Sequence, residues 1–252
     1  MNTQPRFAFF GSTGGSVAAC LALALKDGYS CSALVRNEEK LKKVLSDRGV
    51  DSETQSKHLH IVVGDIKDID AVSKTLKPEG SASVVDVVIS GVGSVMLFTN
   101  PLRPTLQDTT ICEDATNTIF EALRLLGGRP HLVAITSVGI SDKGRDMPLA
   151  LLPLRYWLLP VALADKKKTE RLIEADFAKS EVERAIRGYT IVRPTILTDS
   201  KSCGLDRIRV GGDENPAIGY SISRDDVGLW IFENTIKKAQ ELEGGNIVSM
   251  TY

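Results

Sequence analysis

Short, almost entirely apolar runs recur along this chain, separated by stretches whose apolar residues have helical spacing. The runs occupy residues 7–10, 31–35, 59–63, 84–90 and 132–136. A strand that is apolar on both sides is typical of a parallel sheet with helices on both faces, whereas a half-exposed strand alternates polar and apolar residues. The chain is therefore predicted to fold around a central, mostly parallel sheet.

The remaining segments complete an α/β pattern. Helices are predicted at 17–26, 38–45, 108–126, 165–187 and 225–238, and two further strands at 189–192 and 246–250. The polar, glycine-rich segment 199–215 is predicted to be a surface loop. Open α/β sheets of about this length usually form one domain, so residues 1–252 are predicted to be a single domain.

Composition argues against several other classes of protein. With 31 basic and 32 acidic side chains and 42% hydrophobic residues, neither disorder nor nucleic-acid binding through bulk positive charge is expected. The four cysteines are scattered and no His, Cys and carboxylate cluster occurs, so neither disulfides nor a metal site is predicted. The apolar stretch 149–164 is interrupted by two prolines and an arginine and is shorter than the roughly 20 residues of a membrane span. We expect a soluble, cytoplasmic protein that binds no membrane.

A glycine-rich turn follows the first strand. Glycines at this position let the backbone approach a diphosphate closely, and the amides and dipole of the next helix favour the anion. Dinucleotide binding is therefore predicted for Gly11, Ser12, Thr13, Gly14, Gly15, Ser16 and Val17, in a doubly wound Rossmann fold with a sheet of about seven strands. Val17 stands where the usual fingerprint has its third glycine, so this helix is expected to pack slightly farther from the sheet.

A basic residue ends the second strand. Proteins that select NAD usually carry an acidic residue there, which binds the ribose 2′-hydroxyl. Arg36 occupies this position, and its guanidinium, with help from Lys40 and from Ser12 or Thr13, suits a 2′-phosphate. The cofactor is therefore predicted to be NADP(H) in preference to NAD(H), the alternative being a solvated arginine at a strand end.

Several motifs together resemble the atypical, NmrA-like branch of the short-chain dehydrogenase/reductase superfamily. They are the turn at 11–17, Leu34-Val35-Arg36-Asn37, Gly64-Asp65, Thr136-Ser137, the segment 189–194 with its Val-Arg-Pro end, and Ser223-Arg224-Asp225-Asp226-Val227. The resemblance spans nearly the whole chain. It implies that further cofactor contacts come from Asp65, Ile66, Ser90, Gly91, Val92, Thr136, Pro194, Thr195 and Ile196.

The same resemblance bears on catalysis. Reductases of the superfamily use a Tyr-x-x-x-Lys pair, in which the lysine holds the nicotinamide ribose and lowers the pKa of the tyrosine. Alignment on Glu170 places Lys166 at the lysine and Ala162 at the tyrosine. The candidates for the catalytic site are therefore Lys166, Ser137, which matches the serine that binds the substrate carbonyl, and Tyr156, which could reach the site from a loop. A core or lid tyrosine and a turn serine are the alternatives for the last two.

The resemblance implies an NADP(H)-dependent reductase of a small apolar or aromatic carbonyl compound, such as a secondary metabolite. Segments 137–164 and 199–220 would form the substrate side, and the apolar stretch 149–160 would face the substrate, a dimer interface or the core. Monomer and homodimer both stay open. Two other functions remain: a dinucleotide-sensing regulatory protein without turnover, which the missing tyrosine fits, and a non-redox isomerase, cyclase or lyase on the same fold.

Overall fold

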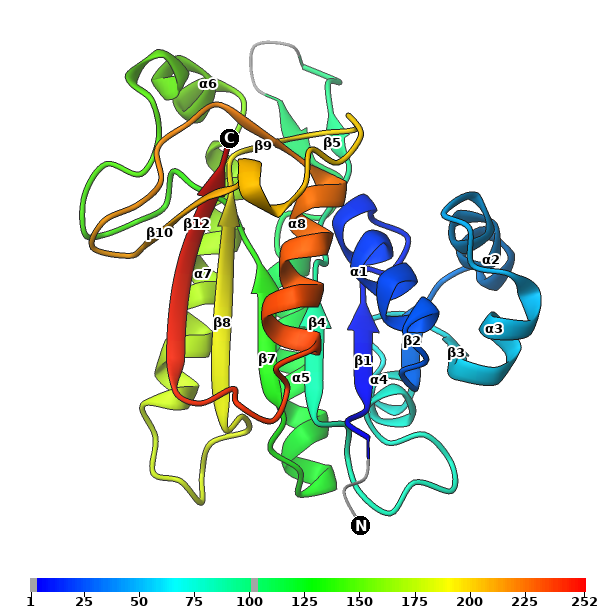
Figure 1. The fold of residues 1–252 in the computed structure, drawn as a ribbon. Helices are drawn as coiled ribbons and strands as arrows, with labels where there is room; N and C mark the ends of the chain where they lie inside the picture. Colours follow the sequence, from blue (N-terminus) through cyan, green and yellow to red (C-terminus); the bar gives the residue numbers. More distant parts are fainter. Residues whose placement is uncertain (1–3, 101–103) are drawn as a thin grey trace.

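In a computed structural model, which describes residues 4–100 and 104–252, one eight-stranded sheet runs through the centre of the protein (Figure 1). The strand order is β10-β12-β8-β7-β4-β1-β2-β3, and every neighbouring pair is parallel except the antiparallel pair β10 and β12. The bounds are β1 (Phe7–Phe10), β2 (Cys31–Val35), β3 (Leu59–Val63), β4 (Val87–Ser90), β7 (His131–Ile135), β8 (Gly188–Pro194), β10 (Arg209–Gly212) and β12 (Gly245–Thr251). The predicted doubly wound, mostly parallel α/β fold is confirmed.

Helices cover both faces of the sheet because successive side chains of each strand point to opposite sides. Phe7 and Phe9 of β1 pack on one face with α1 and α8, whereas Ala8 and Phe10 pack on the other face with α4 and α5. The helices are α1 (Gly15–Lys26), α2 (Glu38–Asp47), α3 (Ser52–His58), α4 (Ile69–Leu76), α5 (Ile111–Leu126), α6 (Leu152–Trp157), α7 (Pro160–Phe177) and α8 (Arg224–Ile231). The apolar runs in β1, β2 and β7 are buried throughout, as predicted for a sheet between two helical layers.

Two small sheets lie outside the main sheet. β5 (Met96–Leu97) pairs antiparallel with β6 (Thr105–Leu106), in the connection between β4 and α5. β9 (Ile196–Thr198) pairs parallel with β11 (Ser221–Ser223), between β8 and α8. Both therefore stand beyond the carboxyl ends of main-sheet strands.

The predicted loop at 199–215 is wrong in part. Residues Leu205–Arg207 form one 3-10 turn, and Arg209–Gly212 form β10, the antiparallel edge strand that is the eighth strand of the sheet. An edge strand with exposed side chains needs no apolar face, so its composition resembles that of a loop.

The predicted helix at 165–187 is displaced. It begins earlier, at Pro160, and ends at Phe177. Beyond this end, the Asp176 carboxylate accepts a hydrogen bond from the Ala185 amide at 2.7 Å and is bound by Arg124, so the chain folds back toward β8. Likewise the α-helix predicted at 225–238 ends at Ile231 and continues as a π-helical turn over Phe232–Ile236, where the Thr235 hydroxyl bonds to the Ile231 carbonyl.

Among the residues that the structure describes, no helix combines the length and the apolar character needed to cross a membrane.

Candidate cofactor and active site

A cleft of about 730 Å³ opens at the carboxyl edge of the sheet. It lies where the strand order reverses, between β1 and β4, which is the position where open α/β sheets bind their ligands. Its volume is within the usual range for cofactor pockets. The walls come from the turn after β1, from the ends of β2 and β3, and from the segments 91–95 and 107–111.

The geometry of the turn after β1 requires glycine. Gly11 has φ +79°, and a Cβ placed on it would lie 2.7 Å from the Gly91 carbonyl oxygen. The Gly14 amide donates to the Gly11 carbonyl at 2.8 Å, and no side chain caps α1. The first amides of α1 therefore have no capping side chain, and the turn fits a bound diphosphate.

Val17 packs directly against the end of β4. A Cβ on Gly91 would lie 2.4 Å from a methyl carbon of Val17, which is 2% exposed. The space that a third glycine of the fingerprint would leave on the helix is thus provided by Gly91 on the strand side.

Two cations stand at the end of β2. Arg36 and Lys40 line the cleft, both are exposed, and neither side chain has a hydrogen bond or ion pair within residues 4–100 and 104–252. Asn37 between them caps α2 by accepting a hydrogen bond from the Lys40 amide at 2.8 Å. The cap fixes the start of α2, so the two basic side chains are free to bind an anion at this end of the cleft.

Ion pairs cross the neighbouring part of the cleft. Asp65 accepts a hydrogen bond from the Lys67 amide at 2.9 Å, and the Lys67 ammonium contacts Asp108 at 2.9 Å and Asp114 at 2.8 Å. Hydrogen bonds to these carboxylates raise the pKa of Lys67, and Lys67 in turn lowers the pKa of Asp108. The loop after β3 is thereby joined to the segment before α5 and to the first turn of α5.

Lys166 projects from α7 onto the ends of two strands. Its ammonium donates to the Ile135 carbonyl at 2.8 Å and to the Val92 carbonyl at 3.2 Å. The preceding residue, Asp165, caps α5 by accepting hydrogen bonds from the amides of Cys112 and Glu113, both at 3.0 Å. These contacts set Lys166 beside the cofactor cleft.

Lys166 lines a small cavity of about 10 Å³. Ser90, Val92, Cys112 and Thr169 also line it, and the buried Thr169 hydroxyl has no partner among the described residues. Burial raises the pKa of the Cys112 thiol to about 11, despite an opposing effect of Lys166, so the thiol is protonated at neutral pH. This cysteine is therefore not a nucleophile in the described environment.

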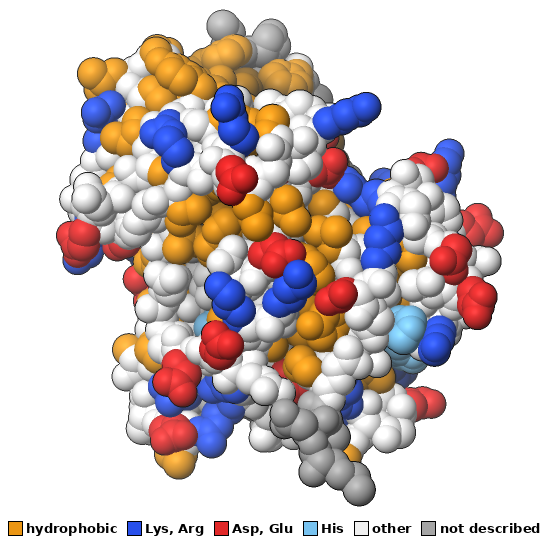
Figure 2. All heavy atoms as spheres, in the orientation of Figure 1, with side chains coloured by type: hydrophobic (Ala, Val, Ile, Leu, Met, Phe, Trp, Pro, Cys, Tyr) orange, Lys and Arg blue, Asp and Glu red, His pale blue; other side chains and the backbone are white. Residues whose placement is uncertain are grey.

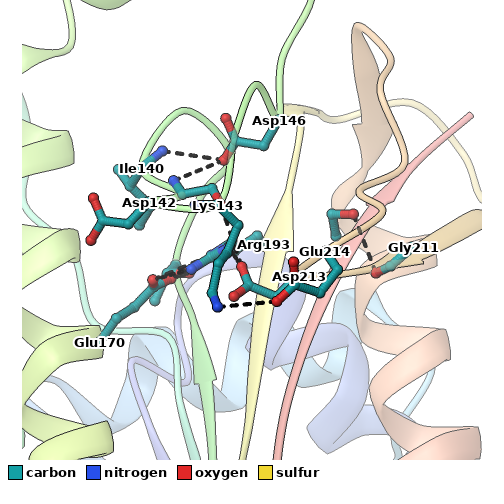
Figure 3. Close-up of polar contacts among 12 residues, drawn as sticks. Ile140, Asp142, Lys143, Asp146, Glu170, Arg193, Gly211, Asp213 and Glu214 are labelled. Carbon is teal, nitrogen blue, oxygen red and sulfur yellow. Dashed lines mark hydrogen bonds and ion pairs between the residues drawn. The ribbon is translucent and has the colours of Figure 1, made fainter.

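A buried ion-pair network joins α7 to β8 and to the substrate side (Figure 3). Glu170 accepts hydrogen bonds from Arg193 at 2.7 to 3.2 Å and from the Thr136 hydroxyl at 2.6 Å. Arg193 also binds Asp213 at 2.6 Å. Burial works against the charged guanidinium, but the hydrogen bonds to Glu170 and Asp213 raise the pKa of Arg193. Glu170 lies one helical turn after Lys166, so the network fixes the register of α7 against the strand ends.

The network extends into the two segments predicted to form the substrate side. The Ser141 hydroxyl donates a hydrogen bond to the Asp213 carboxylate at 3.4 Å. The Lys143 ammonium pairs with the Glu214 carboxylate at 3.0 Å (Figure 3). The Asp146 carboxylate accepts hydrogen bonds from the amides of Gly139, Ile140 and Ser141. Segments 137–164 and 199–220 are therefore bound to each other and to Arg193.

The remaining predicted site residues are distributed as follows. Thr136 and Thr195 are buried, and Ser137 is half-buried two residues after the end of β7. Ile196 is exposed on β9, after Pro194 of β8. Tyr156 is 69% exposed on α6, where the Arg155 guanidinium donates to its hydroxyl at 3.1 Å. In Figure 2 hydrophobic side chains gather at the end of the molecule that carries α6, and Leu149 and Trp157 are among the exposed ones in the segment around it. The structure thus brings Lys166, Ser90 and Val92 to one cavity and directs Tyr156 to the surface.

Sequence reasoning missed several residues of the site. Lys67, Gln107 and Asp108 line the cleft, and Arg193 and Asp213 form the buried network. Arg193 carried one usable signal, since it is the charged residue in an otherwise apolar strand end. The others have no motif, because they come from connections whose course is set by tertiary contacts.

Comparisons with known proteins agree with this geometry. A family model described as NAD(P)H-binding matches residues 11–235. The chain is 44% identical to reductase pytE of Aspergillus terreus, over 100% of this chain and 99% of that protein, and 34% identical to oxidase pynE of Aspergillus niger, over 93% and 94%. A short-chain dehydrogenase/reductase of Veillonella parvula, solved in complex with NADP, has the same fold with a TM-score of 0.68 at 13% identity, covering 99% of this chain and 95% of that chain. The chain belongs to the NAD(P)H-binding family, and its fold is that of a short-chain dehydrogenase/reductase.

Proposed function

We propose that this protein is an NADP(H)-dependent reductase of a small apolar or aromatic carbonyl compound. The observation that carries the cofactor preference is the pair of cations at the end of β2, Arg36 and Lys40, which line the cleft without a partner among the described residues. Two free cations there favour a 2′-phosphate, whereas NAD would leave both of them without an anion. Reductase pytE, 44% identical over the whole chain, supports the direction of the reaction.

The chain's own residues divide the work. The turn at 11–17 would hold the diphosphate, Arg36 and Lys40 the 2′-phosphate, and Lys166 the ribose next to the nicotinamide. When bound, such a cofactor would supply a hydride. Lys166 is already positioned by two backbone carbonyls, and the third N–H of its ammonium would be left to donate to a sugar hydroxyl.

The substrate side favours an apolar compound. Leu149, Tyr156 and Trp157 are all more than half exposed, and no acidic residue occurs between Asp146 and Asp165. A cationic substrate would find no acidic side chain to pair with in this stretch. The proton for the carbonyl oxygen would come from Ser137, from Tyr156 or from a water held by Lys166, because Ala162 stands at the position of the usual tyrosine. Turnover of Ser137→Ala and Tyr156→Phe variants separates these sources.

The lack of a phenol at position 162 also favours a second candidate function, a dinucleotide-sensing protein without turnover. Such a protein would bind NADPH, but it would not oxidise NADPH in the presence of any carbonyl compound.

Calorimetric titration of cofactor-stripped protein with NADPH and with NADH tests the proposal. We expect tighter binding of NADPH, and a loss of roughly tenfold or more in that affinity in Arg36→Ala, with NADH binding nearly unchanged. Lys43→Ala removes a neighbouring charge on the exposed side of α2 and serves as the matched control. A screen of apolar and aromatic carbonyl compounds, followed at the NADPH absorbance, then distinguishes a reductase from a sensor. Binding of neither dinucleotide would refute both.

A further inference from the structure

Arg224, the first residue of α8, lies against the glycine-rich turn. A Cβ on Gly15 would be 2.4 Å from Cδ of Arg224 and 3.1 Å from its Cβ, so the aliphatic stem of the arginine occupies the space that a side chain at position 15 would need. Gly15 is the first residue of α1. The stem of Arg224 therefore packs at the very end of α1 where an anion is expected to bind.

The guanidinium of Arg224 is held by a weak partner. Its Nη1 contacts the Asp199 carboxylate at 2.7 Å, but the side chain of Asp199 is 89% exposed against 32% for Arg224. Ion pairs with so much exposure to water contribute little to stability and are readily exchanged. Asp199 directly follows β9, at the start of segment 199–220.

A second arginine nearby, Arg48, has two polar partners. Arg48 pairs with Asp225 at 2.7 Å and donates a second hydrogen bond to the Gly15 carbonyl oxygen at 3.2 Å. Its guanidinium thus stabilises the turn itself. Of the two, Arg224 is the one whose single polar partner among residues 4–100 and 104–252 is a solvated carboxylate, so it is the cation available for exchange.

We propose that Arg224 is a binding residue for the diphosphate of the dinucleotide, and that its guanidinium exchanges Asp199 for a phosphate oxygen when the cofactor binds. The proposal rests on the dinucleotide site proposed above. The uncapped first turn of α1 supplies amides, and a guanidinium pivoting on its packed stem adds a charge-assisted contact. The diphosphate is common to NADP(H) and NAD(H), so Arg224 acts on affinity for both, whereas Arg36 acts on the choice between them.

The direct test is the affinity of Arg224→Met for NADPH, NADH and ADP. Methionine keeps much of the apolar stem against Gly15 and removes the charge. We expect a loss of roughly tenfold in affinity, by a similar factor for all three ligands, since each carries the diphosphate. Arg207→Met removes the same charge from an exposed 3-10 turn in segment 199–220 and should leave all three affinities unchanged. Thermal melts of each variant show whether the fold is intact.

Asp199→Asn provides a second and opposite test. Removing the competing carboxylate frees the guanidinium, so we expect the affinity for NADPH and NADH to rise about threefold. A purely structural role of Arg224 would give no such gain.

The outcomes separate the proposals from each other. If Arg224→Met binds NADPH, NADH and ADP with the affinities of the unmodified protein, Arg224 does not bind the diphosphate, and the proposal of a cofactor site is unaffected. A loss of affinity confined to NADPH would place the guanidinium at the 2′-phosphate and refute its assignment to the diphosphate. An unchanged affinity in Asp199→Asn would refute the proposed exchange of Asp199 for a phosphate. If the unmodified protein binds no dinucleotide, the proposed function itself fails.

Discussion

His131, at the start of β7, makes stability depend on pH in a way that can be calculated. Its side chain is 1% exposed; Nε2 lies 2.9 Å from the Thr190 hydroxyl, and Nδ1 has no partner among the described residues. Burial, with a smaller effect of Arg187, lowers the pKa of His131 to about 4. A protonated ring would carry an N–H group with no acceptor, in a site closed to water.

The sign follows from the two states. The unfolded chain binds a proton at His131 near pH 6.5, but the folded protein does not do so until about pH 4. Acidification below pH 6.5 therefore favours the unfolded state, and the effect is complete below the folded pKa. One pKa unit is worth about 1.4 kcal/mol, so the full effect is roughly 3 kcal/mol and the part present at pH 5 is about 2 kcal/mol.

Denaturant unfolding of the protein and of His131→Gln between pH 7.5 and 4.5 measures this contribution. Other groups titrate in the same range, but they cancel in the difference between the two curves. We expect the free energy of unfolding to fall about 2 kcal/mol less in His131→Gln than in the unmodified protein between pH 7 and pH 5. His60→Gln, at an exposed position of β3, is the control and should follow the unmodified protein. Parallel curves for His131→Gln and the unmodified protein would show that His131 is not buried in its neutral form.

Two further predictions concern the cofactor edge of the sheet. Glu170→Gln leaves the Arg193 guanidinium buried without its main counter-charge and should lower the free energy of unfolding by about 3 kcal/mol. Glu113→Gln breaks the more exposed pair with Lys168 and should lower it by less than about 1 kcal/mol. Equal losses of the two variants in denaturant unfolding would contradict this prediction. Gly11→Ala places a methyl group 2.7 Å from the Gly91 carbonyl oxygen, at a residue with positive φ, and should abolish measurable NADPH binding. Gly212→Ala, with no atom within 4 Å of its added methyl group, should bind NADPH normally. Retained NADPH binding in Gly11→Ala would rule out the close approach of the turn to β4.

Much of the fold could be predicted because its signals are local. The strands at 7–10, 31–35 and 59–63 were predicted to the residue, since each is a short run of mostly apolar residues between polar segments. The strand predicted at 84–90 begins three residues later, at Val87. Val84 packs against Gly128 instead, and the Val85 amide bonds to the Leu76 carbonyl. Apolar character alone does not separate a strand from a buried loop.

The site divides in the same way. The turn at 11–17 and Arg36 could be recognised because they stand at fixed positions after predicted strands, and the structure places residues 11–14 and Arg36 in one cleft. Asp165, by contrast, caps a helix that begins more than fifty residues earlier in the chain, and Arg193 of β8 pairs with Glu170 of α7. Such pairs depend on how α5, α7 and β8 pack together, and no local sequence pattern predicts that packing. The exposed position of Tyr156 is of the same kind, because it depends on how α6 sits on the molecule.

The contact between Val17 and Gly91 has a consequence for the recognition of this fold in other sequences. The close approach of helix to strand is usually ascribed to one glycine on the helix, but here the missing volume is on the strand, about seventy residues away. What the fold requires is a limit on the combined size of two side chains, and either partner can meet it. A pattern search that demands glycine at position 17 would pass over this chain, whereas a search that scores the two positions jointly would accept it.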